Sequence, residues 1–248
     1  MDTDNYTVTP SFYNTEEVFM SYLGRTSYYN SLQNAVSKII MLSKALDILD
    51  MGFGTGATTI RISRENPGAN ITAVDVRGTM LDILYSKKKE QEVKNINPIC
   101  DEMCHYIRNT KGSYDAITML YSFHHIEDPL EKKRKFLVDS YCKLKKGGHL
   151  IVGETFIPEE AESLGDSKAL SKLWESRAIE AYGSTFWNTL EGKDTRNIER
   201  SREIAKFSKD HELEAASHVA TRDEEYLVKK SWLTEIAQYI GYSVIMDE

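Results

Sequence analysis

The sequence lacks the features of disulfide-rich, membrane-spanning and nucleic-acid-coating proteins. Three cysteines among 248 residues are too few, and odd in number, for a disulfide framework, and Cys100 and Cys104 lack a second pair of zinc ligands. No apolar run approaches the ~20 residues of a membrane span. The net charge of −7 disfavours nonspecific phosphate binding. The composition therefore predicts a soluble cytoplasmic protein with reduced thiols, no membrane partner and no general affinity for nucleic acid.

Between residues 45 and 154 the sequence alternates between strand and helix patterns. We expect strands at ALDILD, NITAVDV, INPIC, YDAITML and HLIVGE. Helices are expected at ATTIRISREN, at about 79–91 and at DPLEKKRKFLVDSYCKLKK, with Gly147 just past the end of the last one. Such alternation predicts an α/β fold with a doubly wound, mostly parallel sheet.

The alternation is absent from the two segments that flank this region. Residues 1–42 predict an N-terminal helical lid of two short helices broken near Gly24. Residues 159–226 are charged and helical in pattern, and predict a helical cap inserted after the fifth strand. The alternation resumes with a helix pattern at KKSWLTEIAQYIG and a strand pattern at SVIMDE. We therefore expect a core of residues 43–158 plus 227–248, a lid of 1–42 and a cap of 159–226.

The stretch ILDMGFGTGATTI places three glycines directly after the first strand. Gly52, Gly54 and Ala57 satisfy the GxGxxA pattern of dinucleotide-binding proteins, which makes NAD one candidate cofactor. Asp50, however, would repel a pyrophosphate in this turn. S-adenosylmethionine carries no phosphate, and its ammonium and sulfonium groups are complementary to a carboxylate. Asp50 as a simple cap of the next helix is the alternative interpretation.

Two further acids follow successive strands of the predicted sheet. Asp75 ends the second strand and can accept hydrogen bonds from both ribose hydroxyls, whereas Asp101 follows the third strand and can accept one from an adenine amino group. Val76 and Glu102, which adjoin these acids, belong to the same candidate site. Acids at three successive strand ends favour an adenosine ligand without phosphates.

The chain resembles the class I S-adenosylmethionine-dependent methyltransferases over roughly residues 45–155. The matching segments are LDILDMGFGTG, ITAVDV, CDEM, YDAITMLYSFHHIEDP and LKKGGHLIVGE. The resemblance implies that the glycines at 52, 54 and 56 pass beneath the methionyl group. It implies that Asp75 holds the ribose, that Asp101 lies near the adenine amino group, and that Leu120 and Tyr121 line the methyl-transfer site.

The segment YLGRTSYYN is also similar to the lid of small-molecule members of this superfamily. Tyr29 is the candidate for contact with the methionyl group, and Arg25 for contact with the cofactor carboxylate; packing of an aromatic helix face is the alternative. The sheet of the family ends in a hairpin with an antiparallel last strand, whereas SVIMDE is followed by no such strand here.

His124 follows the fourth strand and is a candidate general base for an acceptor hydroxyl or amine. His218 is a second candidate. The pattern HHxxD also permits a metal ligand pair, but we expect no metal because such sites draw on several segments. A carboxylate acceptor would need no base, and arginines of the cap could hold it instead: Arg177, Arg196, Arg200, Arg202 and Arg222.

The function predicted from the sequence is methyl transfer from S-adenosylmethionine, with S-adenosylhomocysteine as product, to a small-molecule or peptide acceptor. O-methylation in natural-product biosynthesis is favoured. The alternatives are an RNA methyltransferase, an NAD-dependent oxidoreductase and a cofactor-binding scaffold without catalysis. We expect a monomer or a homodimer.

Overall fold

The computed structural model describes residues 27–127, 130–154, 156 and 228–245, with side chains from residue 30 onward. The chain divides into two compact units, and the described residues belong almost wholly to the one made of Asn30–Phe156 and Val228–Glu248. The predicted cap at 159–226 and the first 26 residues lie outside the described part. None of the described helices is long and apolar enough to cross a membrane.

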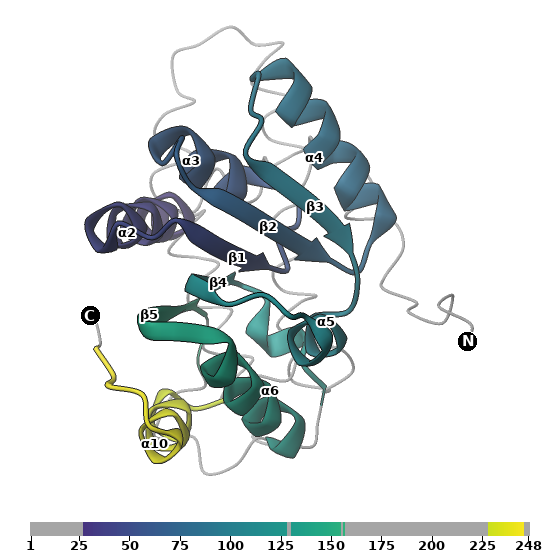
Figure 1. Cartoon of the computed structure of the whole chain (residues 1–248). Helices are drawn as coiled ribbons and strands as arrows, with labels where there is room; N and C mark the ends of the chain where they lie inside the picture. The colour runs from purple at the N-terminus through teal and green to yellow at the C-terminus, as the bar shows by residue number, and fades with distance from the viewer. Residues whose placement is uncertain (1–26, 128–129, 155, 157–227, 246–248) are drawn as a thin grey trace, which may run out of the picture. The chain divides into compact units, whose positions relative to one another are not determined.

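A parallel sheet forms the centre of this unit and confirms the predicted fold class (Figure 1). Its strands are β1 (Asp47–Met51), β2 (Asn70–Asp75), β3 (Ile96–Cys100), β4 (Tyr114–Leu120) and β5 (Leu144–Gly153). Their order in the described sheet is β3-β2-β1-β4-β5, and every neighbouring pair is parallel. The strand order reverses between β1 and β4, where open α/β sheets bind their ligands.

Helices cover both faces of the sheet. They are α2 (Ser27–Ser43), α3 (Ala57–Glu65), α4 (Gly78–Glu90), α5 (Met103–Asn109), the 3₁₀ turn η1 (Phe123–His125), α6 (Leu130–Lys143) and α10 (Lys230–Ile240). The sequence patterns predicted α3, α4, α6 and α10 but neither α5 nor η1. Both of these are seven residues or shorter, which is too short for a helical period to repeat.

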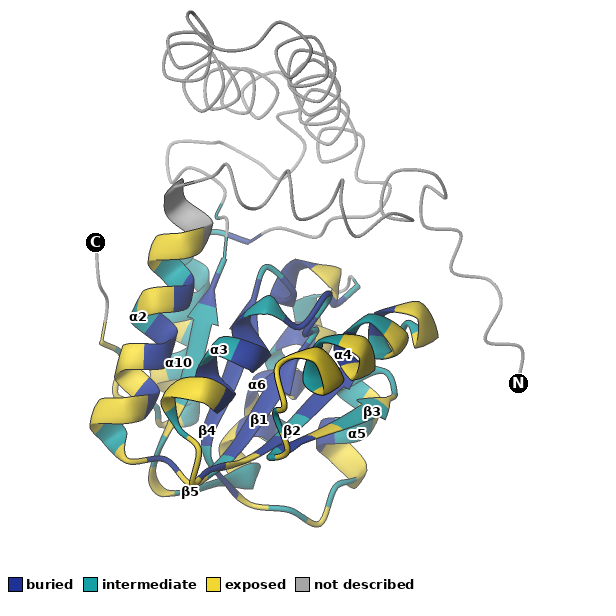
Figure 2. Cartoon of the chain, turned by 90° about the horizontal axis from the view of Figure 1, so that it is seen from above, coloured by how far each residue is buried: buried dark blue, intermediate teal, exposed yellow. Residues whose placement is uncertain are grey.

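Alternating strand residues divide the core into two layers. Ile48 and Ile71 face the helices α2, α3 and α4, whereas Leu49 and Ile117 face α5, α6 and α10. Figure 2 shows the strands as the buried centre and the outward helix surfaces as exposed. A sheet covered on both faces explains the nearly continuous apolar strands in the sequence.

Helix α2 belongs to this unit from Asn30 onward. Val36 and Ile40 of α2 lie in the core beside Ile48, and Gln33 donates a hydrogen bond to the Thr58 hydroxyl of α3 at 3.1 Å. The boundary therefore falls at Asn30, earlier than the predicted residue 43. The apolar positions of α2 repeat with helical spacing and so bury one face against the core.

Two predicted element boundaries differ from the structure. The prediction that Gly147 follows the end of a helix is wrong, because α6 ends at Lys143 and β5 begins at Leu144. Pairing with β4 overrides the helical pattern of LKK, and Gly147, with φ of +79°, lies within β5 near a register shift against β4. Residues 243–245 of the predicted strand SVIMDE form no strand, and 246–248 lie outside the described residues.

Candidate active site

The loop after β1 requires glycine at two positions because other segments approach it closely. A Cβ on Gly52 would lie 2.4 Å from the Cβ of Ser122, and a Cβ on Gly56 would lie 2.5 Å from Cδ1 of Leu84. Both glycines also have positive φ, which larger residues rarely adopt. Ser122 donates a hydrogen bond to the carbonyl of Met51 at 2.8 Å. The loop is therefore fixed at the reversal point between β1 and β4.

Asp50 lies inside the protein beneath this loop. One of its oxygens accepts a hydrogen bond from the Thr59 hydroxyl at 2.6 Å, and the other accepts one from the Thr118 hydroxyl at 2.8 Å. Burial raises the pKa of Asp50, and these two bonds oppose the rise. Asp50 is 2% exposed and does not cap α3, whose N-cap is Gly56. Its carboxylate joins β1 to the first turn of α3 and to β4.

Asp75 is hydrogen-bonded to the glycine loop. Its Oδ2 accepts a hydrogen bond from the backbone N–H of Gly54 at 2.9 Å, and its Oδ1 accepts one from the backbone N–H of Arg77 at 3.0 Å. Burial raises its pKa, and these backbone bonds oppose the rise. Each carboxylate oxygen has a second lone pair for a ligand hydroxyl. Asp75 therefore has the geometry that ribose binding needs.

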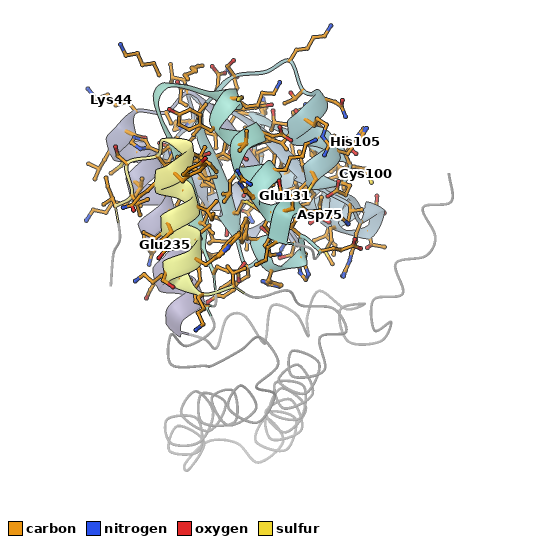
Figure 3. The ribbon with its side chains drawn as sticks, turned by 90° about the horizontal axis from the view of Figure 1, so that it is seen from below. Lys44, Asp75, Cys100, His105, Glu131 and Glu235 are labelled. Atoms are coloured by element: carbon orange, nitrogen blue, oxygen red, sulfur yellow. The ribbon has the colours of Figure 1, made fainter. Side chains whose placement is uncertain are left out.

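The third acid lies at the next strand end along the sheet. Asp101 directly follows β3, and its backbone N–H donates to the carbonyl of Asp75 at 3.1 Å. Its carboxylate lies 2.9 Å from Nδ1 of His105. In Figure 3, Asp75, Cys100 and His105 lie on the same side of the described unit. The sequence pattern did not predict that Asp101 would contact His105, which lies four residues later on α5.

Glu102 has a structural partner on each carboxylate oxygen. Oε1 accepts a hydrogen bond from the backbone N–H of Cys104 at 2.9 Å, and Oε2 accepts one from that of His105 at 2.7 Å. Glu102 thereby caps the N-terminus of α5. Val76, which directly follows Asp75 and was also assigned to the cofactor from the sequence, has an exposed side chain. The loops after β2 and β3 thus meet in one place.

The end of β4 carries a backbone strain. Tyr121 has φ of +49°, and its N–H donates to the carbonyl of Gly153 at 2.8 Å. A tyrosine in this left-handed region costs about 1–3 kcal/mol and is common at functional sites. Leu120, the last residue of β4, is buried against Gly153. The strain lies where the resemblance to class I methyltransferases implies the methyl-transfer site.

His124 is hydrogen-bonded to Glu154, an acid that was not predicted as a site residue from the sequence. Its Nδ1 lies 2.8 Å from Oε1 of Glu154, and its backbone N–H donates to Oε2 of the same residue at 3.2 Å. The two side chains are 10% and 1% exposed. Glu154 directly follows β5, so an acid also stands at the end of this strand. The position of this acid directly after a predicted strand was the sequence signal that could have indicated Glu154 as a site residue.

Three predicted site residues have no described side chain. Arg25 and His218 lie outside the described residues, and Tyr29 is described only as backbone within α2. Within the described part of the chain, histidine, cysteine and acidic side chains form no group of three that could hold a metal ion. Cys100, Cys104 and Cys142 carry free thiols.

The geometry agrees with the comparison to known protein families. Residues 48–148, from within β1 into β5, match a family model described as a methyltransferase domain. This part of the chain is similar to methyltransferase domains, and its fold is that of the class I methyltransferases. The acids at the strand ends fit S-adenosylmethionine, whose ammonium and sulfonium groups are complementary to carboxylates.

Curated relatives of the methyltransferase domain act on chemically different acceptors, as their names state. A mitochondrial 2-methoxy-6-polyprenyl-1,4-benzoquinol methylase of Caenorhabditis elegans is 32% identical over 113 residues, which cover 43% of this chain and 36% of that protein. A tRNA (guanine-N(7)-)-methyltransferase of Neisseria meningitidis is 31% identical over 114 residues, covering 42% and 46%. The chain thus spans less than half the length of either protein.

A solved structure shares the fold of the chain. An O-methyltransferase family protein from Burkholderia thailandensis aligns with 88% of this chain and 52% of that chain, with a TM-score of 0.57 and 12% identity. At this identity the likeness shows a shared fold.

Proposed function

We propose that the chain is an S-adenosylmethionine-dependent methyltransferase that methylates a small-molecule or peptide acceptor. O-methylation of a hydroxyl or a carboxylate, as in natural-product tailoring, is the favoured reaction. The observation that carries the proposal is the bond between Gly54 and Asp75, which brings the glycine loop and the ribose-binding acid together at the strand ends.

In this proposal the strand ends hold the cofactor in one orientation. Asp75 accepts hydrogen bonds from the ribose hydroxyls, and Asp101 accepts one from the adenine amino group when His105 leaves it a lone pair. The glycine loop lies beneath the methionyl group because its glycines permit close approach. Asp50 supports the loop from below through Thr59 and Thr118. Leu120 and Tyr121 then border the transferring methyl group.

Methyl transfer at this site needs the acceptor atom to be aligned with the methyl group and, for some acceptors, a general base. The bound cofactor supplies an electrophilic methyl group on a sulfonium. Holding the acceptor in line with that methyl supplies much of the rate acceleration. His124 lies beyond the end of β4 and is the described residue proposed to take a proton from a hydroxyl or amine acceptor.

Two measurements on the full chain test the proposal. Calorimetry with S-adenosylmethionine, S-adenosylhomocysteine and NAD identifies the ligand, and binding of NAD alone would overturn the proposal. Turnover is measured as S-adenosylhomocysteine release, with mass spectrometry of four acceptors: a hydroquinone, an aromatic carboxylate, a short peptide and bulk tRNA. Methylation of any of the first three supports the proposal.

The remaining outcomes correspond to the alternatives. Methylation of tRNA alone would make the chain an RNA methyltransferase, which the Neisseria relative favours and the net charge of −7 disfavours. Binding of S-adenosylmethionine without turnover of any acceptor would favour a scaffold without catalysis.

A further inference from the structure

The side chain of Ser122 bridges the reversal point between β1 and β4. These two strands lie side by side at the centre of the sheet (Figure 1), and the last residues that they pair are Asp50 and Thr118. Beyond that pair, the Ser122 hydroxyl donates a hydrogen bond to the carbonyl of Met51 at 2.8 Å. Ser122 is 2% exposed. This buried bond therefore joins the residue before the glycine loop to the segment that follows β4.

The backbone on either side of Ser122 is fixed as well. Tyr121, with its φ of +49°, turns the chain directly before Ser122, and its N–H donates to the carbonyl of Gly153 at 2.8 Å. The carbonyl of Ser122 accepts the N–H of His125 at 3.2 Å and so begins η1. Ser122 also packs so closely on Gly52 that a Cβ there would lie 2.4 Å from its own. Ser122 is thus a joint between the glycine loop and the segment after β4.

The other strand ends of the proposed cofactor site are held together by their own hydrogen bonds. The N–H of Gly52 donates to the carbonyl of Val74 at 2.8 Å, and that of Gly54 donates to Oδ2 of Asp75 at 2.9 Å. The N–H of Asp101 donates to the carbonyl of Asp75 at 3.1 Å. Because none of these bonds uses the Ser122 hydroxyl, its removal leaves the ends of β1, β2 and β3 joined to one another.

We propose that Ser122 is a positioning residue for methyl transfer, which sets the place of the glycine loop relative to the end of β4. The inference rests on the proposed function, in which the loop lies beneath the methionyl group and Leu120 and Tyr121 border the transferring methyl. The acceptor atom, the methyl carbon and the sulfur must lie in line, and a misplacement of about 1 Å costs about 10²-fold in rate. Ser122 therefore acts on this alignment and not on cofactor affinity.

Kinetics and calorimetry of Ser122→Ala separate alignment from affinity, because alanine removes the hydroxyl but keeps the Cβ. We expect kcat, for the acceptor identified by the methyl-transfer assay, to fall about 10-fold or more. The Kd for S-adenosylhomocysteine should stay within about twofold of wild type, since the bonds among β1, β2 and β3 remain. The matched control, Ser86→Ala on the exposed face of α4, should change neither quantity. A folded Ser122→Ala variant with wild-type kcat overturns the proposal.

The alternative role for Ser122 is structural, as a donor that only satisfies the buried carbonyl of Met51. In that case Ser122→Ala lowers the Tm, while the folded variant keeps both kcat and Kd. If Ser122→Ala does not fold, Ser122→Cys replaces it, because a thiol fills a similar space and is a weaker donor. A lower kcat with an unchanged Kd supports the proposal, and wild-type kcat in this variant overturns it.

NMR-detected hydrogen exchange on the full chain with S-adenosylhomocysteine gives a readout that needs no acceptor. Ser122→Ala should speed exchange of the His125 N–H, which is bonded to the Ser122 carbonyl, and leave that of the Gly54 N–H at its wild-type rate. Unchanged exchange at both amides, or equal acceleration at both, overturns the proposal. Absence of any methyl transfer would instead contradict the proposed function, and the exchange rates would still decide whether Ser122 joins the two sides.

Discussion

The backbone N–H of Gly54 donates a hydrogen bond to Oδ2 of Asp75 across 2.9 Å. This bond joins the loop after β1 to the end of β2. A short glycine motif and an acid 21 residues later are thereby brought together at one edge of the sheet.

Replacing Asp75 should weaken cofactor binding more than it weakens the fold. Asp75→Asn replaces one carboxylate oxygen with an NH₂ group, so the backbone N–H of Gly54 or of Arg77 loses its acceptor, and the ribose loses one acceptor oxygen and the negative charge. We expect the affinity for S-adenosylhomocysteine to fall by about 1.5–3 kcal/mol, the cost of hydrogen bonds to a charged group. Calorimetry measures the change, and Asp82→Asn on the exposed face of α4 is the control. A Kd close to wild type would remove Asp75 from the site.

Gly52 should tolerate no side chain. Gly52→Ala brings a Cβ to 2.4 Å from that of Ser122 at a φ of +69°, and the backbone strain alone costs about 1–3 kcal/mol. We expect a lower Tm in thermal denaturation and loss of cofactor binding. Gly68→Ala, where a Cβ has nothing within 4 Å, is the matched control. Equal Tm values for the two variants would show that Ser122 does not constrain the loop.

Asp50 should make the protein less stable as the pH rises. Burial holds the pKa of Asp50 above its ordinary 3.8 in the folded chain, so between the two values the folded state keeps a proton that the unfolded chain has lost. The free energy of unfolding therefore falls as the pH rises through that window. The raised pKa of Asp75 acts in the same direction.

Urea denaturation from about pH 4 to about pH 7 measures this dependence. Asp50→Asn should make the fall in unfolding free energy shallower, because one of the two titrating groups is gone. Asp82→Asn, whose side chain is exposed, should leave the slope unchanged. A steeper slope in Asp50→Asn would mean that the sign of the argument is wrong.

Lys133 should stabilise the turn that carries His124. Lys133→Met removes the donor to the carbonyls of Phe123 and Ile126 and the contact of Nζ with the Phe123 ring at 5.3 Å. We expect the free energy of unfolding to fall by about 1–3 kcal/mol because the Ile126 carbonyl loses the Lys133 donor, whereas the Phe123 carbonyl still accepts the backbone N–H of Ile126. Chemical denaturation measures it, with Lys135→Met on the exposed face of α6 as the control. Equal stability of the two variants would contradict this role.

Local sequence patterns determined the fold class and the positions of the acids. Apolar runs and helical periods repeat within each element, so β1 to β5, α3, α4, α6 and α10 were predictable without long-range information. Because parallel strands end at one edge of a sheet, the alternation also placed Asp75 and Asp101 near the glycine loop. That arrangement favoured an adenosine cofactor without phosphates, and the resemblance of the same segments to class I methyltransferases implied the family.

Only the tertiary structure determined which residue each acid is hydrogen-bonded to. Asp50 was expected beside the cofactor, yet its oxygens accept the hydroxyls of Thr59 and Thr118, because the packing of α3 and β4 buries it. Glu154 meets His124 only because β4 and β5 pair in register. Hydrogen bonds between residues 30 or more positions apart leave no periodic trace in a single sequence, so geometry rather than pattern supplies them.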